Sequence, residues 1–347
     1  MRAVFLLLLC SFLFSGCCFD AGDGTTTPGD GGQDDENYTG AGGSGVSVVV
    51  DPQHNVTLSQ NDSGHVPPPP PVDVTEIDYT EEHAAMFTIY FIHVGDDRLG
   101  VQGDAILVKK GDFDMLIDAG SAQTSARVVD FLKARNVDDL DVLMLTNGKP
   151  DHYGGIPAVV SQFPVEEFWW AGTEVFTDSD YADAVESATQ KAEMTREIEA
   201  GYFRELNNMS FTILNPPHER FADLNNDGIV TLVRDRNFTI LLMSSVQTGA
   251  HNKLINQYRD RINVDVLQAP FNGLGGGTQN FGIFLVSSMP EVVIVSGSSD
   301  DSPEAGGSRE PFFRYLVQYN ITSYETYTGG TVRVTSDGYE YDVAYLG

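Results

Sequence analysis

The pattern of hydrophobic and polar positions first becomes regular near residue 86. Residues 87–94 alternate between the two classes and are rich in β-branched and aromatic side chains, which predicts a strand. Similar patterns at 104–109 and 113–118 predict two further strands. A helix is expected next, with Ser125 as its N-cap and apolar positions at Val128, Val129, Phe131, Leu132 and Ala134. The apolar run at 142–145 then predicts a buried strand.

The rest of the chain repeats this order of strands followed by a helix. Helices are expected near 155–163, over 181–200, where Ala, Glu, Lys and Met are frequent, and over 311–319. Strands are expected at 167–170, 209–214, 229–233, 238–243, 264–268, 281–286, 292–295, 331–335 and 340–345. Because the two halves share this order, we predict an α/β protein with two pseudo-equivalent sheets packed face to face and helices outside.

The first 85 residues have a different composition. Residues 1–17 combine Arg2, an apolar run too short to span a bilayer, and Leu-Phe-Ser-Gly before Cys17, which indicates a signal peptide of the lipoprotein type with Cys17 as the lipidated residue. An ordinary cleaved secretory signal is the alternative, and Cys18 adds ambiguity. We therefore expect an exported protein of the cell envelope, anchored on the outer side of the cytoplasmic membrane or secreted.

Residues 18–85 are predicted to form a flexible, acidic tether, because Gly, Asp, Thr, Ser and Pro dominate them. The prolines at 67–71 predict a stiff polyproline II segment, and the valine-rich stretch at 46–50 predicts one short strand. Residues 86–347 are then the folded domain.

Charge and cysteine content exclude several classes of function. The formal net charge is −30, which indicates a solvated acidic surface and argues against binding nucleic acid through basic patches. The three cysteines, Cys10, Cys17 and Cys18, all lie at the N-terminus. The predicted domain therefore has no disulfide framework and no thiolate ligand for a metal.

Several short motifs follow one another in the predicted domain. They are His93-Val94-Gly95 with Gln102-Gly103-Asp104-Ala105, then Leu116-Ile117-Asp118-Ala119-Gly120, then Asp151-His152-Tyr153-Gly154-Gly155, and finally Asn226-Asp227-Gly228-Ile229-Val230. Together they resemble the metallo-β-lactamase superfamily, most closely the hydrolase domain of ComEC-type competence proteins. The resemblance implies a four-layer αββα sandwich and, in typical members, two metal ions, usually zinc, that generate hydroxide and polarise the substrate.

Most of the ligands that the resemblance implies are missing. Asn147 and Lys149 stand where the first two histidines are expected, and only Asp151 and His152 remain of that motif. By the same resemblance, Ser245 replaces a bridging aspartate, Phe271-Asn272 replaces a pair of histidines, and the late histidine falls at 308–310. Since zinc normally takes at least three protein ligands, we expect no dinuclear centre and no cofactor. Asp151 is expected to hydrogen-bond the loop backbone and His152 to pack beneath the loop.

Three hypotheses remain open. The first is a non-catalytic binding or scaffold module, with an unknown ligand or protein partner and with a membrane contact through the N-terminal lipid. The second is a metal-dependent hydrolase of the phosphodiesterase or nuclease type, with zinc or manganese on Asp151, His152 and a third ligand, His93 or His251. The third is an envelope structural protein, supported by the tether and by the glycosylation sequons at Asn208, Asn237 and Asn320.

Other candidate residues have simpler interpretations. Residues 223–229 match the start of an EF-hand loop, but Arg234 occupies the twelfth position, so a turn is predicted. Asp118 is expected to orient the loop at 146–155, and His93 is either a core histidine or a ligand. His251 is interpreted as an exposed helix start or a displaced ligand. Ser244 and Ser245 lack the Gly-x-Ser-x-Gly context of a serine nucleophile.

Overall fold

A computed structural model describes residues 46–50, 56–60, 86–172, 179–274, 281–300 and 307–346. The chain divides into two compact units, Met1–Pro69 and Pro70–Gly347. In the first unit, β1 (Val46–Val50), the strand expected there, pairs antiparallel with β2 (Val56–Gln60). The predicted signal peptide, Cys17 and the rest of the predicted tether lie outside the described residues.

The second unit contains an eight-stranded sheet in the order β17-β16-β3-β4-β5-β6-β7-β8. Its pairs are antiparallel from β17 to β5 and parallel from β5 to β8. The strands are β3 (Phe87–Phe91), β4 (Ile106–Lys110), β5 (Phe113–Ile117), β6 (Leu140–Leu145), β7 (Val165–Trp170), β8 (Ala192–Glu197), β16 (Val332–Ser336) and β17 (Tyr341–Tyr345).

A seven-stranded sheet in the order β15-β14-β13-β12-β11-β10-β9 repeats this plan. Its pairs are antiparallel from β9 to β12 and parallel from β12 to β15. The strands are β9 (Phe203–Leu206), β10 (Met209–Asn215), β11 (Val230–Asp235), β12 (Phe238–Leu242), β13 (Val266–Gln268), β14 (Val292–Val295) and β15 (Thr322–Glu325). The predicted pseudo-equivalence of the two halves therefore holds at the level of strand direction.

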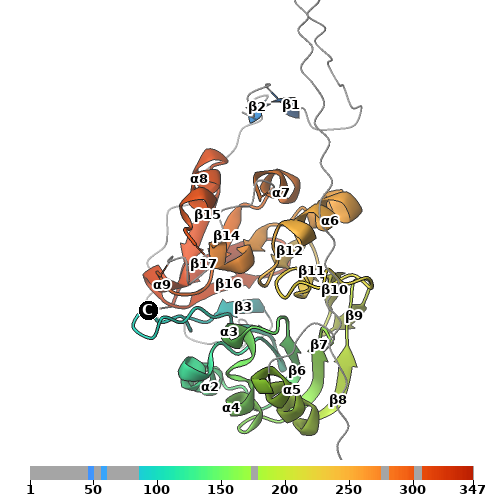
Figure 1. Ribbon diagram of the computed structural model, residues 1–347, viewed down its shortest axis with the longest axis vertical. Coiled ribbons are helices and arrows are strands. Elements are labelled where there is room, and N and C mark those ends of the chain that lie inside the picture. Colours follow the sequence, from blue (N-terminus) through green and yellow to red (C-terminus); the bar gives the residue numbers. More distant parts are fainter. Residues whose placement is uncertain are drawn as a thin grey trace, which may run out of the picture. The chain divides into compact units, whose positions relative to one another are not determined.

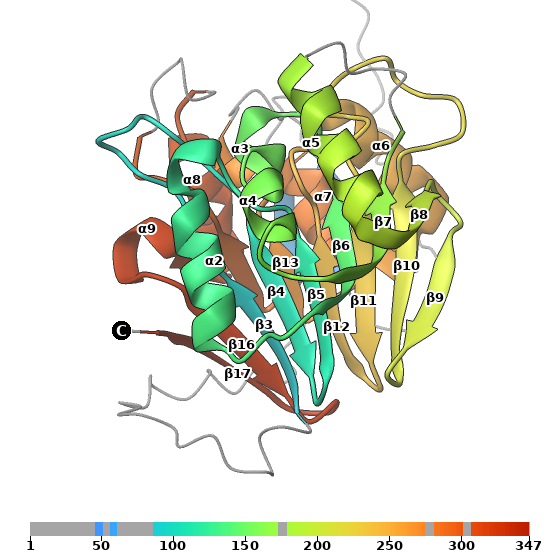
Figure 2. The same ribbon diagram turned by 90° about the horizontal axis from the view of Figure 1, so that it is seen from below.

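Helices cover the outer face of each sheet (Figures 1 and 2). On the eight-stranded sheet they are α2 (Ser125–Ala134), α3 (Pro150–Tyr153), α4 (Ile156–Val160) and α5 (Ser179–Lys191). On the seven-stranded sheet they are α6 (Thr248–Tyr258), α7 (Phe281–Ser288) and α8 (Glu310–Gln318), and α9 (Thr326–Gly329) follows β15. None of the helices in the described part of the chain is both long and apolar enough to cross a membrane.

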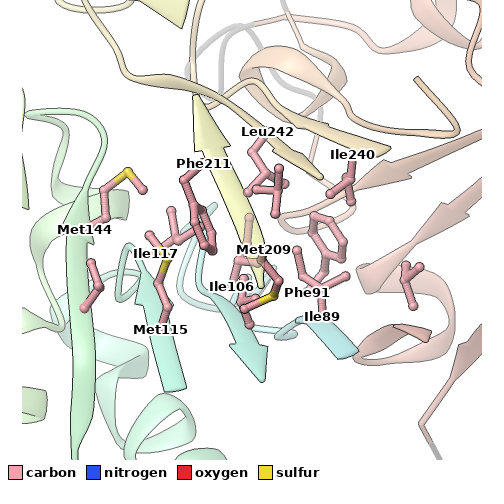
Figure 3. Packing of buried hydrophobic residues seen from close by; sticks show 14 of the residues in the cluster. Ile89, Phe91, Ile106, Met115, Ile117, Met144, Met209, Phe211, Ile240 and Leu242 are labelled. Carbon is pink, nitrogen blue, oxygen red and sulfur yellow. The ribbon is translucent and has the colours of Figure 1, made fainter. Parts of the chain in front are cut away.

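Three apolar clusters separate these layers. The central cluster joins the inner faces of the two sheets and includes Met115, Met144, Phe211 and Ile240 (Figure 3). A second cluster packs the eight-stranded sheet against α2, α4 and α5, and a third packs the other sheet against α6, α7 and α8. The predicted four-layer αββα sandwich is thus confirmed, and buried apolar area between layers is its main source of stability.

One predicted element is wrong in type and another is too long. Residues 281–286 form the start of helix α7 rather than a strand, because a short apolar run has no periodicity that separates the two. Phe281, Phe284 and Leu285 form its buried face, while Ile283 is exposed. The helix predicted over 181–200 ends at Lys191 and is followed by β8, whose pairing with β7 overrides the helix propensity of Ala, Glu and Met.

The central cluster can be tested on two phenylalanines of neighbouring strands. Phe211 on β10 is fully buried against the rings of Phe113 and Trp169, whereas the side chain of Phe203 on β9 is 54% exposed. We expect Phe211→Ala to lower the free energy of unfolding by about 3–5 kcal/mol. The matched change Phe203→Ala should cost less than about 1 kcal/mol, as for an exposed position. Urea unfolding curves measure both, and equal losses would contradict this assignment of the core.

Candidate functional site

The loop from Thr146 to Gly155 lies directly on the turn that follows β5. The amide of Ala119 donates to the carbonyl of His152 at 2.9 Å, and that of Gly155 donates to the carbonyl of Gly120 at 3.0 Å. A Cβ atom on Gly155 would lie 2.0 Å from the carbonyl oxygen of Ala119. Glycine is therefore required by the close approach of two backbones, whatever chemistry the loop carries.

The Asp118 carboxylate organises this loop, as expected from the sequence. Asp118 is buried and has a left-handed backbone, with φ of 57°. Its Oδ1 accepts the amide of Thr146 at 2.8 Å, and its Oδ2 accepts the Thr146 hydroxyl at 2.5 Å. Charge-assisted hydrogen bonds of this kind compensate the burial of a carboxylate.

His152 is fully buried beneath the loop and both of its ring nitrogens are engaged. Nδ1 lies 2.7 Å from Oδ2 of Asp118, and Nε2 lies 2.8 Å from Oγ of Ser245. Burial alone would lower the pKa of His152. The charge of Asp118, its hydrogen bond, and the charges of Asp151 and Asp104 outweigh burial and raise the pKa to about 9. At neutral pH the imidazole is therefore protonated and donates from both nitrogens.

Asp104 is a second buried carboxylate at the same place. Its Oδ1 accepts Nε2 of Gln268 at 3.0 Å, and its Oδ2 accepts Nδ2 of Asn272 at 3.5 Å. The same Oδ2 lies 3.9 Å from Nε2 of His152. Burial raises the pKa of Asp104, because desolvation penalises its charged form, and the nearby imidazole opposes this effect.

The structure brings together the residues that replace the expected metal ligands. Asn147 is buried and donates to the carbonyl of Leu224 at 2.9 Å. The Lys149 ammonium lies 4.4 Å from the centre of the Phe271 ring and 3.8 Å from Oδ2 of Asp151. The Asp151 carboxylate thus faces the Lys149 cation, and its predicted hydrogen bond to the loop backbone stays a prediction. The Asn147 amide thus forms a hydrogen bond, while the Lys149 ammonium packs on the Phe271 ring and pairs with Asp151.

The other residues that stand where metal ligands are expected also lie at this site. The Ser245 hydroxyl contacts His152, as described above. Arg309, within the segment where the late histidine was expected, is buried despite its charge. Its Nε donates to the carbonyl of Asn272 at 2.8 Å, and its Nη2 donates to Oε1 of Gln102 at 3.0 Å. A guanidinium therefore ties together three loops at the edge where the family's metals are expected.

The donor set does not fit the dinuclear centre that the resemblance implies. Within the described residues, no group of three or more His, Cys, Asp or Glu side chains is placed to hold a metal ion. Nε2 of His152 is directed at Ser245, and the Lys149 ammonium and the Arg309 guanidinium supply positive charge at neighbouring positions. Cations repel a metal and offer it no lone pair.

Ser245, His152 and Asp118 have the connectivity of a serine-hydrolase triad. All three side chains are buried, with at most 2% of the surface of each exposed. A protonated imidazole also cannot take the proton of the serine hydroxyl, and the raised pKa of His152 keeps it protonated at neutral pH. The arrangement therefore supports a buried polar link between the two sheets rather than a nucleophile.

The two other histidines considered as metal ligands lie elsewhere. Nδ1 of His93 contacts the carbonyl of Thr326, and the backbone amide of His93 donates to Oγ1 of Thr331 at 3.1 Å, so His93 joins β3 to the C-terminal segment. His251 is fully buried, which corrects the exposed helix start predicted for it. Its turn faces inward because Oδ1 of Asn226 accepts the amide of Ala250 at 3.0 Å.

The EF-hand-like segment is a turn, as predicted. Oδ1 and Oδ2 of Asp227 accept the amides of Phe221 and Asp223 at 2.8 and 3.1 Å. Both oxygens of this buried carboxylate are thus used within the segment. Ile229 follows the turn, and its amide donates to the carbonyl of Thr146 at 2.8 Å. This hydrogen bond connects the seven-stranded sheet to the loop from Thr146 to Gly155.

Two glutamines at the site were missed by the sequence analysis. Oε1 of Gln268 accepts the amides of Met243 and Ser244, at 2.9 and 3.1 Å, while its Nε2 donates to Asp104. Gln102 accepts from Arg309 and from the amide of Ser298 at 2.9 Å. Their positions in the sequence could have indicated them, because Gln268 ends an apolar strand and Gln102 belongs to the Gln-Gly-Asp-Ala motif.

Comparisons with known proteins agree with this architecture. A family model described as "Metallo-beta-lactamase superfamily" matches residues 98–199. The chain is 20% identical over 206 residues to ComE operon protein 3 of Bacillus subtilis (strain 168) and 26% identical over 196 residues to Competence protein ComA of Neisseria gonorrhoeae. These alignments cover 59% and 56% of the chain but only 26% of each relative. The chain therefore spans about a quarter of the length of these curated relatives.

Among solved structures, the metallo-beta-lactamase fold protein YhfI from Bacillus subtilis is 12% identical, with a TM-score of 0.47, over 72% of this chain and 99% of that one. Igni18, a metallo hydrolase from the archaeon Ignicoccus hospitalis, is 15% identical, also with a TM-score of 0.47, over 71% and 98%.

The protonated state of His152 predicts how stability depends on pH. A histidine whose pKa rises from 6.5 in the unfolded chain to about 9 in the folded one stabilises the fold fully below pH 6.5. This contribution is lost as the pH rises through about 9. We expect the free energy of unfolding to fall by about 3 kcal/mol across this window.

Two variants identify the titrating group. His152→Gln should abolish most of the slope, because its amide can still contact Ser245 but does not titrate. His218→Gln should keep the slope, because the His218 side chain is 89% exposed. Urea unfolding at a series of pH values measures the slope of the free energy of unfolding against pH. An unchanged slope in His152→Gln would assign the titration to another residue.

Proposed function

We propose that this chain, which contains a metallo-β-lactamase superfamily domain related to ComEC-type competence proteins, is an exported protein held to a membrane by a lipid on Cys17. In this proposal the domain is a non-catalytic binding or scaffold module. The observation that carries it is the state of His152, whose two ring nitrogens are directed at Asp118 and Ser245. An imidazole held in this way offers no lone pair to a metal ion.

The charge balance of the site supports the same proposal. In metal-dependent hydrolases, divalent cations balance clustered carboxylates and activate water. Here Asp104 and Asp118 are close to a protonated imidazole, and the Asp151 carboxylate faces the Lys149 ammonium. Side chains of the domain itself thus supply positive charge to these carboxylates. In this proposal the fold is therefore maintained without a metal.

The alternative function is a hydrolase of the phosphodiesterase or nuclease type with a mononuclear zinc or manganese site. The intact Asp151-His152 pair is the observation that favours it. It requires a third ligand, and the ring of His93 is engaged by Thr326 while that of His251 lies among phenylalanines. The net charge of −30 also disfavours a nucleic acid as substrate, because phosphate groups would be repelled.

Metal content separates the two functions. We expect the purified protein to contain substoichiometric zinc and manganese, and Asp151→Ala to leave this content unchanged. Restoring ligands through the triple change Asn147→His, Lys149→His and Ser245→Asp should produce a protein that binds about one zinc ion per chain, because it supplies donors beside Asp151 and His152. Elemental analysis after dialysis measures both proteins.

A parent protein that retains a tightly bound zinc or manganese ion, and that loses hydrolysis of a phosphodiester or ester in Asp151→Ala, would overturn the non-catalytic proposal. Lys149→Met alone is the matched control for the triple variant. It removes the cation without adding a donor, so it should not gain zinc.

Lipid anchoring is tested at the two adjacent cysteines. Cys17→Ser should move the protein from the membrane fraction to the soluble fraction, because a thioether-linked lipid cannot form on serine. Cys18→Ser is the matched control and should leave the protein with the membranes. Fractionation of cells that express each full-length variant, followed by immunoblotting, reports the distribution. Release by both variants, or by neither, would contradict the assignment of Cys17.

A further inference from the structure

The three Asn-x-Ser/Thr sequons of the folded domain all place their asparagine on a surface turn. They begin at Asn208, Asn237 and Asn320, and each of these asparagines is exposed. By contrast, no sequon begins at an asparagine that is buried in the described part of the chain. In exported proteins this motif is the acceptor of N-linked glycans. The other sequons of the chain lie outside the described residues, at Asn37, Asn55 and Asn61.

Asn208 lies at the tip of the hairpin between β9 and β10. Leu206 pairs with Met209, so Asn207 and Asn208 form a two-residue turn, with φ of 46° and 61°. Positive φ at both central residues is the geometry of a type I′ turn, which favours asparagine. The turn explains the asparagine but does not require a hydroxyl two residues later. Ser210 supplies that hydroxyl, and it is partly exposed.

Asn320 lies in the turn that ends α8. Its φ is 55°, its amide donates to the carbonyl of Val317 at 3.2 Å, and the amide of Ile321 donates to that of Leu316 at 2.9 Å. Helices often end at a residue with left-handed backbone, and asparagine is accepted there after glycine. Thr322, which completes the sequon, is exposed at the start of β15. The asparagine and the hydroxyl residue of this sequon are thus both accessible.

The sequon at Asn237 differs, because its hydroxyl is buried. Thr239 is only 5% exposed. Its Oγ1 donates to Oδ2 of Asp265 at 2.9 Å and accepts the amide of Asp265 at 3.2 Å. An enzyme reaches this hydroxyl only after both hydrogen bonds break, which leaves buried polar groups without their partners. The folded domain therefore presents Asn237 without the second half of its sequon.

Both accessible sequons lie at edges of the seven-stranded sheet. Asn208 follows β9 and Asn320 precedes β15, and these strands are the outermost two of the sheet. Apolar side chains are exposed nearby, since Phe203 on β9 is 54% exposed and Val317 is 81% exposed. Strand edges of this kind are prone to pair with other chains, which a bulky, hydrophilic group opposes. A glycan at either position therefore has a physical effect on the fold that carries it.

We propose that Asn208 and Asn320 carry N-linked glycans that are attached to the folded domain, and that Asn237 carries none. In this transfer the side-chain nitrogen of asparagine forms a bond to the anomeric carbon of a lipid-linked oligosaccharide and loses one proton. The bond between that carbon and a phosphate oxygen of the lipid carrier breaks, and the lipid phosphate leaves. The proposal rests on the export proposed above, because the motif is modified in secreted chains. It does not depend on metal content or on the binding role.

Transfer to the folded protein tests whether the structure selects the sites. The full-length chain, produced without glycans, is incubated with a lipid-linked oligosaccharide and a single-subunit oligosaccharyltransferase, and glycopeptides are quantified by mass spectrometry. Occupancy at Asn237 should be at least about tenfold lower than at Asn208 and Asn320, because Thr239 must first lose two hydrogen bonds. Synthetic peptides that contain the three sequons are the control, and they should accept the glycan to a similar extent.

Matched variants verify each assignment without changing an asparagine. Ser210→Ala should abolish transfer to Asn208 alone, and Thr322→Ala should abolish transfer to Asn320 alone, because each removes only a sequon hydroxyl. Equal occupancy of all three sites in the folded protein would overturn the proposal. So would a folded protein that is unmodified at Asn208 and Asn320 although the peptides are modified.

Protein from the cells that naturally produce this chain provides the second test. The chain isolated from their membrane fraction should carry glycans on Asn208 and Asn320 and none on Asn237. A membrane-bound chain without glycans at the first two positions, or with a glycan at the third, would contradict the proposal. Failure of the proposed export is recognised separately, because the chain is then absent from the membrane fraction.

Discussion

A buried carboxylate, that of Asp118, is the constraint on which the centre of this molecule depends. A negative charge in an apolar interior persists only when donors surround it, and here the donors are the amide and hydroxyl of Thr146 and the ring of His152. These contacts join the end of β5 to the end of β6. Through its other nitrogen, His152 continues the chain of contacts to Ser245, which follows β12 in the opposite sheet. One carboxylate thus aligns strand ends from both sheets, and the loops that follow those strands have little freedom to adopt another arrangement.

The same network also supplies positive charge to buried carboxylates. Asp104 and Asp118 remain buried, and the positive charge close to them comes from the His152 imidazolium. The buried guanidinium of Arg309 also supplies positive charge near this site, and it donates hydrogen bonds to Gln102 and to the backbone carbonyl of Asn272. Such internal ion pairs add little net stability compared with apolar packing, but loss of one member leaves the other unpaired and is costly. A single substitution at these positions is therefore expected to cost more stability than replacement of both partners together.

Much of the architecture could be predicted from the sequence, because alternating and apolar runs report directly on which faces are buried. Strands such as 87–91 and 142–145 were found in this way, and the order of motifs around Asp118 and His152 indicated the family. Residues 281–286 could not be assigned correctly, since an all-apolar run lacks the polar positions that reveal a period. The burial of His251 and the partners of Gln268 and Arg309 also could not be predicted, because they arise from contacts between segments far apart in the chain. The placement of Ser245 opposite His152 likewise follows from the packing of one sheet on the other.

The pairing of β16 with β3 has a consequence for the order of folding. Val332 lies opposite Phe91 and Ser336 opposite Phe87, so the first strand of the domain is completed by one of the last. All five residues of β3 are buried in the finished sheet. During synthesis, which starts at the N-terminus, the edge of β3 that later pairs with β16 therefore stays unpaired until almost the whole domain has been made. During that interval the strand is able to pair with other chains. A loss of only the last twenty residues would make this exposed edge permanent, a far greater effect than the peripheral position of the C-terminus suggests.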